Sequence, residues 1–306
     1  MNKRWVVLGI PAVFLACGGP PQEETAVDGE LPPAVRVHAT THPLAYFAER
    51  IGGERVEVTL PVLPGRDPAA WTPEPAEILA FQDADLILMN GAEYEGWRET
   101  ATLPASRLVD TSADFEESLI YVEDAITHSH GPEGEHTHGE MASVTWLDLS
   151  LAARQAEAIR DALIARDPDG ASGFHDRFDE LVAKLRELDE SLEAALARFQ
   201  GDRFLSATPS YHYFARRYGV EVEALRFDVE DPMGHDFWHD LEHALSHGAV
   251  SVMLWEEEPP AGVRDRLADL GIESLVVDPA ANPRLGRDFA AAMVENRRRI
   301  EGFDGR

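Results

Sequence analysis

The chain has 306 residues, of which 56 are acidic and 27 basic, giving a formal net charge of −29 at pH 7. A surface this acidic repels nucleic acids and anionic lipid headgroups and concentrates cations, which argues against a nucleic-acid-binding function. The length allows two domains, each with its own core, and the single cysteine excludes an internal disulfide.

The amino-terminal segment has the pattern of a bacterial lipoprotein signal. Two basic residues precede an apolar run, residues 5–16, that leads to Cys17. This run is too short to span a membrane and is broken by glycine and proline, so it predicts an export signal. Phe-Leu-Ala before Cys17 resembles a lipobox, which makes Cys17 the expected lipidation site. We expect residues 1–17 to be signal peptide and lipobox and residues 18–33 to be a flexible acidic tether. A cleaved, soluble secreted protein is the alternative.

Residues 34–170 have the pattern of an α/β lobe. The predicted strands and helices alternate, with strands at 35–40, 56–62 and 85–90 and helices at 43–51 and 74–81. This order predicts a parallel sheet with helices on both faces.

A histidine-rich loop interrupts this lobe within residues 121–140. Its four histidines lie within eleven residues and are His128, His130, His136 and His138. The intervening glycines and proline predict a solvated loop rather than a helix or strand. Neutral imidazole is a common ligand of zinc and similar ions, so we expect the loop to be an accessory metal-collecting site. A polar linker with incidental histidines is the alternative.

Residues 171–200 are predicted to form one long amphipathic helix that links the two halves of the chain. Apolar residues recur at spacings of three and four, namely Phe178, Leu181, Leu185, Leu188, Leu192 and Leu196. A helix of about 26 residues is about 39 Å long and could run the length of the molecule.

A second α/β set follows in residues 201–306. Its predicted strands and helices lie at 204–208, 210–218, 220–225, 235–247, 250–255, 260–270 and 274–278. The sequence therefore predicts an α/β fold, with two (β/α) lobes that contain parallel sheets and are joined by one long helix. A cleft is expected between the lobes. Ligands of such sheets bind outside the carboxyl ends of the strands.

The predicted helix at 235–247 carries a histidine row with a spacing of four residues. Its members are His235, His239, His243 and His247. Neighbours at this spacing lie on one helix face and can bind an ion in pairs. Apolar residues displaced by about 200° around the helix are Phe237, Leu241 and Leu245. If these apolar residues pack on the core, the histidines face solvent, either as a peripheral accessory metal site or as an ordinary solvated face.

One enzyme-like pattern lies within this row. Residues 239–243 fit the His-x-x-Glu-His arrangement of a zinc hydrolase, in which two histidines bind zinc and a glutamate, here Glu242, activates water. The motif is short, and the chain has no nucleophile elbow, phosphate loop or dinucleotide fingerprint. We therefore expect a protein that is not an enzyme and keep zinc hydrolysis as an alternative.

Several sequence blocks occur in a recognisable order. They lie at 40–53, 64–68, 73–75, 83–91, 95–97, the histidine-rich loop, 146–148 and 213–219. In this order they resemble the solute-binding proteins of zinc and manganese ABC importers. The resemblance covers nearly the whole chain after the tether and implies two lobes joined by a rigid helix. It also implies a metal ion held by three histidines and one carboxylate.

The expected ligand set is altered in this chain. Where the resemblance places the three histidines, the sequence has Ala69, Val144 and Thr208, and only the carboxylate remains, as Asp278. A single aspartate does not hold zinc tightly, because such sites use three or four ligands.

Other residues could rebuild the site. His42 follows the first strand, His212 lies one helical turn after Thr208, and Glu256 ends a predicted strand near the cleft. Together with Asp278 they make a candidate set of two histidines and two carboxylates. The alternative is a cleft that no longer binds metal or that binds another solute.

The resemblance implies an exported lipoprotein, anchored at the periplasmic or extracytoplasmic face of the bacterial membrane. We expect a monomer that captures a divalent metal and delivers it to the permease and ATPase of an ABC importer. Zinc is the expected ion, with manganese or another divalent metal as the alternative. A surface metal buffer or chaperone with a degenerate cleft is the competing interpretation.

Overall fold

The computed structural model describes residues 34–62, 68–122, 140–225, 227–228, 230–283 and 287–304. The predicted signal peptide, Cys17 and the tether lie outside these residues, so those predictions stay untested. The same holds for the four histidines of the histidine-rich loop, which are His128, His130, His136 and His138. Within the described ranges, no helix combines the length and apolar character that crossing a membrane requires.

The amino-terminal half of the described chain begins with alternating strands and helices. In chain order its elements are β1 (Val35–Ala39), α1 (His42–Gly52), β2 (Val56–Thr59), α2 (Pro75–Asp83), β3 (Leu86–Met89), β4 (Leu108–Asp110), the hairpin strands β5 (Tyr121–Val122) and β6 (Glu140–Met141), and α3 (Leu149–Arg166). Strands β1 to β4 form a parallel sheet in the order β2-β1-β3-β4. All four residues of β3 are buried, as expected for a strand covered on both faces.

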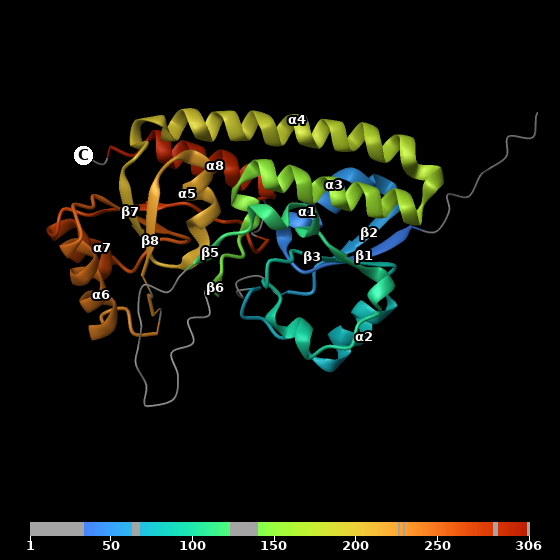
Figure 1. Ribbon diagram of the computed structural model, residues 1–306, viewed down its shortest axis with the longest axis horizontal. Helices are drawn as coiled ribbons and strands as arrows, with labels where there is room; N and C mark the ends of the chain where they lie inside the picture. The colour runs from blue at the N-terminus through green and yellow to red at the C-terminus, as the bar shows by residue number, and fades with distance from the viewer. Residues whose placement is uncertain are drawn as a thin grey trace, which may run out of the picture. The chain divides into compact units, whose positions relative to one another are not determined.

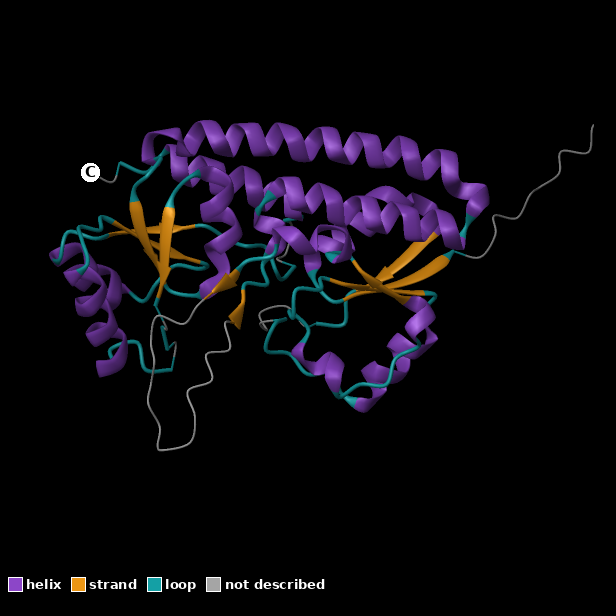
Figure 2. Ribbon diagram, viewed as in Figure 1, coloured by secondary structure: helices purple, strands orange, loops and turns teal. Residues whose placement is uncertain are grey.

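The carboxy-terminal half repeats this plan. Its elements are α4 (Ala171–Leu196), β7 (Arg203–Ser206), α5 (His212–Tyr218), β8 (Glu221–Ala224), α6 (His235–Ser246), β9 (Val252–Trp255), α7 (Ala261–Asp269), β10 (Glu273–Val276) and α8 (Phe289–Glu301). The second sheet is also parallel, in the order β10-β9-β7-β8. The two separate parallel sheets, shown in orange in Figure 2, confirm the predicted two-lobe α/β fold.

The long helix α4 runs past both lobes (Figure 1). It packs against α1 and α3 of the first lobe and against α5 and α8 of the second. Its buried side includes the predicted leucine row, Leu181, Leu185, Leu188, Leu192 and Leu196. These leucines belong to a core cluster that also contains residues of both sheets, including Leu88 and Phe204. The amphipathic periodicity therefore predicted both the helix and the face that it buries.

Three features were not expected from the sequence. Strand β4 completes the first sheet, β5 and β6 pair as an antiparallel hairpin, and α8 packs beside α4. The hairpin strands lie at the two ends of residues 121–140, the range predicted for the histidine-rich loop. The predicted domain boundaries at 170 and 200 stay predictions.

Candidate metal centre

Each sheet has one point at which its connections leave in opposite directions. In the first sheet this point lies between β1 and β3, and in the second it lies between β7 and β9. Ligands of parallel α/β sheets bind beyond the carboxyl ends of the strands at such points. The residues that follow β1, β3, β7, β9 and β10 are therefore the candidates for a binding site.

Glu95 ties the ends of β1 and β3 together. The Thr40 hydroxyl donates to Glu95 Oε1 at 2.5 Å, the Asn90 backbone N–H donates to the same oxygen at 2.7 Å, and the Gly91 N–H donates to Oε2 at 3.3 Å. The side chain is buried, and this burial raises the pKa of Glu95 to about 7 against the opposing effect of its hydrogen bonds. Glu95 thus holds the side chain of Thr40, two residues before His42, against the backbone that follows β3.

His42 is the first residue of α1 and reaches the second lobe. Its backbone N–H donates to the Ala281 carbonyl at 3.1 Å, and its Nδ1 lies 3.1 Å from the Ala280 carbonyl oxygen. Burial lowers the pKa of the His42 imidazole, which favours the neutral ring. A carbonyl can only accept, so Nδ1 carries the proton and Nε2 carries the lone pair. This is the orientation that metal-binding histidines commonly adopt.

Asp278 follows β10 and organises the segment that His42 contacts. Its Oδ1 accepts the Ala280 N–H at 2.8 Å, and its backbone exchanges two hydrogen bonds with the Asn296 side chain. Ala280 has a φ of 56°, an uncommon conformation for a residue other than glycine. The indole N–H of Trp146, from the first lobe, donates to the neighbouring Pro279 carbonyl at 2.7 Å. Both lobes therefore hold this strained segment, and the negative charge of Asp278 acts on the His42 ring.

Glu256 lies at the second switch point, after β9. Its Oε1 accepts the hydroxyls of Thr208 at 2.7 Å and Ser210 at 2.6 Å. Tyr211 is fully buried and donates its hydroxyl to the Val277 carbonyl at 2.8 Å. Burial, together with the charges of Glu256 and Asp278, raises the Tyr211 pKa. Thr208, which stands where the resemblance places a histidine, thus supports a carboxylate instead.

The predicted set of two histidines and two carboxylates is only partly assembled. His212 begins α5, and its Nδ1 lies 2.8 Å from the Pro209 carbonyl oxygen. Among the residues that the structure describes, no three His, Cys, Asp or Glu side chains lie close enough to hold one ion. His42 and Asp278 come together across the lobes, but His212 and Glu256 do not join them in a metal-ready group. The four-residue set stays a prediction that requires a rearrangement on binding.

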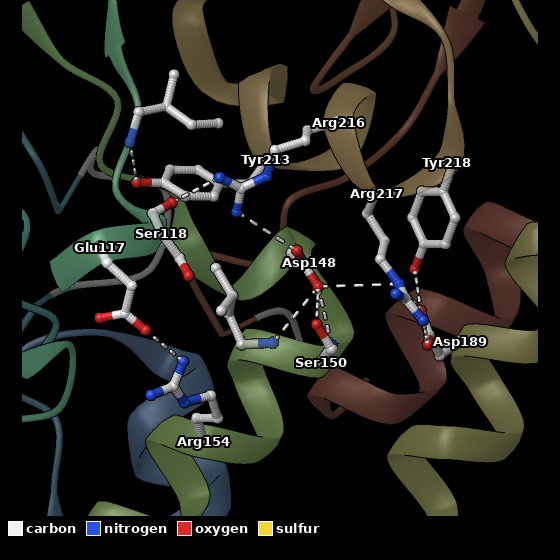
Figure 3. Close-up of polar contacts among 12 residues, drawn as sticks. Glu117, Ser118, Asp148, Ser150, Arg154, Asp189, Tyr213, Arg216, Arg217 and Tyr218 are labelled. Carbon is white, nitrogen blue, oxygen red and sulfur yellow. Dashed lines mark hydrogen bonds and ion pairs between the residues drawn. The ribbon is translucent and has the colours of Figure 1, made fainter. Parts of the chain in front are cut away.

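A second polar cluster joins α5 to the first lobe (Figure 3). Asp148 caps α3 and lies 3.6 Å from Arg216, whose guanidinium also donates to the Ser118 carbonyl at 2.6 Å. The next residue, Arg217, binds the Asp189 carboxylate of α4 with two N–H groups. The α5 helix, and with it His212 at its first position, is therefore anchored to α3 and α4.

The Asp189 contact was not predicted from the sequence. Asp189 directly follows Leu188 of the leucine row and is only 7% exposed. An acidic residue within the apolar stripe of a long helix is the signal that could have identified it, because buried carboxylates are paired.

The histidine row on α6 faces solvent. All four of its rings are exposed, whereas Phe237, Leu241 and two further residues of α6 are buried. This confirms that the apolar row is the core contact. Glu242 of the His-x-x-Glu-His pattern is also exposed.

The family model described as zinc-uptake complex component A, periplasmic (ZnuA), matches residues 37–302. The chain belongs to this family. Zinc-binding lipoprotein AdcA of Streptococcus pneumoniae (strain ATCC BAA-255 / R6) is 24% identical in an alignment of 299 residues that covers 93% of this chain and 57% of AdcA. The chain thus spans little more than half the length of that relative. The high-affinity zinc uptake system protein ZnuA of Bacillus subtilis is 27% identical over 297 residues, covering 91% of this chain and 89% of that protein.

Solved structures share the fold of this ZnuA-family chain. The metal-dependent lipoprotein YcdH of Bacillus subtilis gives a TM-score of 0.71 at 20% identity, covering 87% of this chain and 98% of that one. The periplasmic zinc-binding protein TroA of Treponema pallidum also gives 0.71 at 20% identity, covering 88% and 98%. These comparisons confirm the predicted family resemblance and the two-lobe fold.

Proposed function

We propose that this protein is the exported solute-binding component of an ABC importer. In this proposal it captures a divalent metal ion between its lobes, and zinc is the expected ion. Membership of the ZnuA family supports the class of ligand. One structural observation supports the location: His42 of the first lobe and the Asp278–Ala281 segment of the second lobe meet where β1 and β10 end.

The chemistry of the four candidate ligands suits zinc. His42 and His212 each place Nδ1 on a backbone carbonyl, which leaves Nε2 with its lone pair for a metal ion. Asp278 and Glu256 add oxygen ligands from the ends of β10 and β9. Two imidazoles and two carboxylates fill a tetrahedral zinc site. In the proposal, bound zinc draws the loop after β9 and the start of α5 toward His42.

The chain acts at the outer face of the bacterial membrane in this proposal. Cys17 carries the lipid anchor, residues 18–33 are the tether, and the folded part is a monomer. Its partners are the permease and the ATPase of the importer. The histidine-rich loop collects ions for the cleft, and the acidic surface raises the local cation concentration.

Calorimetric titration of the mature chain with Zn²⁺, and separately with Mn²⁺, tests the proposal. We expect one dominant high-affinity site. His42→Ala and Asp278→Ala should each weaken it by at least about 100-fold, since loss of a residue that only supports a metal ligand already costs 10–100-fold. His175→Ala, an exposed histidine on α4, is the matched control and should leave the dominant site unchanged.

A variant with the four histidines of the loop replaced by serine separates the loop from the cleft. The proposal expects this variant to keep the dominant site. Several weak sites of similar affinity, all lost with the loop or α6 histidines, would instead support the surface metal buffer. Peptidase activity that disappears in Glu242→Gln would support the hydrolase.

A further inference from the structure

The histidine row on α6 divides into two unequal pairs. The rings of His235 and His239 are nearly parallel, with their centroids 5.8 Å apart. Those of His243 and His247 are closer, at 4.5 Å, and nearly perpendicular, at 79°. An ion held by two imidazoles has each nitrogen at about 2.0–2.1 Å, so the two nitrogens lie at most about 4 Å apart. Of the two pairs, the second has its rings nearer to each other, and both rings are within reach of one common ion.

The backbone under the closer pair is fixed. The His247 N–H donates to the Ala244 carbonyl and so continues the helical turn through His247. Arg203 donates to the Ala244 carbonyl at 3.0 Å and to the Gly248 carbonyl at 3.3 Å, which holds the end of α6 against β7. The guanidinium also pairs with Glu223. A pair on a fixed backbone loses little entropy when it binds an ion.

The surroundings of the first pair differ. His235 Nδ1 lies 3.6 Å from the Asp236 carboxylate, and His239 Nδ1 lies 3.5 Å from that of Asp240. At these distances each carboxylate faces Nδ1 and leaves Nε2 open to a metal ion, so the first pair is the competing site that the test must separate from the second. No such contact is found for His243 or His247 among the residues that the structure describes.

We propose that His243 and His247 chelate one divalent transition-metal ion on the surface of α6, outside the cleft. Imidazole pairs select zinc, copper and nickel over magnesium and calcium, which prefer oxygen ligands. Only two protein ligands contribute and water fills the other positions, so the ion exchanges readily. The net charge of −29 raises the local concentration of such ions. This site does not depend on the proposed function of the cleft.

Residue-specific chemical modification tests the proposal on the full mature chain. Diethyl pyrocarbonate modifies exposed neutral imidazoles, and mass spectrometry of the peptides reports each histidine separately. Free Zn²⁺ is set with a nitrilotriacetate buffer, so that binding elsewhere on the chain does not change it. We expect His243 and His247 to become half protected at the same free zinc concentration. His247→Ala should raise the concentration that half protects His243 by about tenfold or more, because the second ligand acts at high effective concentration.

His239→Ala is the matched control, because His239 is the other neighbour of His243 at a spacing of four. This variant should leave the half-protection of His243 within twofold of the parent protein. All of the altered side chains are exposed, so the fold should be retained, as far-ultraviolet circular dichroism can verify. The proposal is wrong if the free zinc concentration that half protects His243 does not change in His247→Ala. It is also wrong if His239→Ala changes that concentration more than His247→Ala does.

Discussion

The buried carboxyl of Glu95 should make the stability of the protein fall as the pH rises toward neutrality. Glu95→Gln is the perturbation that exposes this effect, because glutamine has nearly the same shape and does not titrate. Its amide nitrogen would face the Gly91 N–H or another donor in place of a carboxyl oxygen. This mismatch lowers the free energy of unfolding of the variant by an amount that does not depend on pH. The pH dependence, not the absolute stability, is therefore the informative quantity.

The magnitude follows from the two pKa values of the carboxyl. Burial raises the pKa of Glu95 from 4.5 to about 7 in the folded protein. Between these values the folded state binds more protons than the unfolded state, so the free energy of unfolding decreases as the pH rises. At 1.36 kcal/mol per unit of pKa, the loss is about 3 kcal/mol, fully developed above pH 7 and absent below about pH 4.5.

Urea unfolding of the metal-free mature chain, measured at steps from pH 4.5 to pH 8, provides the assay. The difference in unfolding free energy between the parent protein and Glu95→Gln should fall by about 3 kcal/mol as the pH rises across this range. Glu93→Gln, at a nearby exposed position, should show no such trend. A difference that stays constant within about 1 kcal/mol would refute the reasoning, because it would place the folded-state pKa near its ordinary value.

Two further predictions concern α5 and the altered ligand positions. Asp189→Ala removes the acceptor of Arg217. It should lower the free energy of unfolding, measured in urea, by about 2 kcal/mol, which lies between the values for exposed and buried ion pairs. Glu190→Ala, on the exposed side of α4, should cost under about 0.5 kcal/mol, and equal losses would contradict the anchoring role. Thr208→His restores an imidazole beside Glu256 and should tighten zinc binding in calorimetry by about tenfold or more. An unchanged zinc affinity in Thr208→His would mean that the ion does not bind near the residues that follow β7.

Periodicity predicted the parts of the fold whose burial is set by one repeating face. The leucines of α4 are buried as their spacing required, and so are Phe237 and Leu241 of the α6 apolar row, while Leu245 is partly buried against the same core. Strand β4 has only three residues, none of them buried, so no run of apolar residues indicates it. Periodicity does not reveal α8, because its carboxy-terminal end carries three consecutive arginines, which conceal the apolar face that packs on α4.

The candidate site was less predictable, because its contacts join residues distant in sequence. The His42 ring meets the Ala280 carbonyl across 238 positions, and the Trp146 indole meets Pro279 across 133. The positive φ of Ala280 has no sequence signal, since alanine rarely adopts it. His42 and Asp278 do follow strands, as the sequence predicted, and the structure brings them to the lobe junction, but their role as metal ligands stays a prediction. The sequence did not show that Thr208 and Ser210 bind Glu256.

In the proposed site, the loss of three expected histidines changes the ligand chemistry, while the ion stays between the strand ends of the two lobes. The strand ends are still fixed, by Glu95 in the first lobe and by Asn296 in the second. In the proposed set, Glu256 replaces an imidazole with a carboxylate that two hydroxyls support. Two carboxylates make the set more anionic and richer in oxygen than three histidines with one carboxylate. Oxygen ligands favour harder ions such as manganese, so this set should discriminate less strongly for zinc. The histidine-rich loop and the α6 pair, which offer only imidazole, would then supply the preference for zinc at the surface before an ion reaches the cleft.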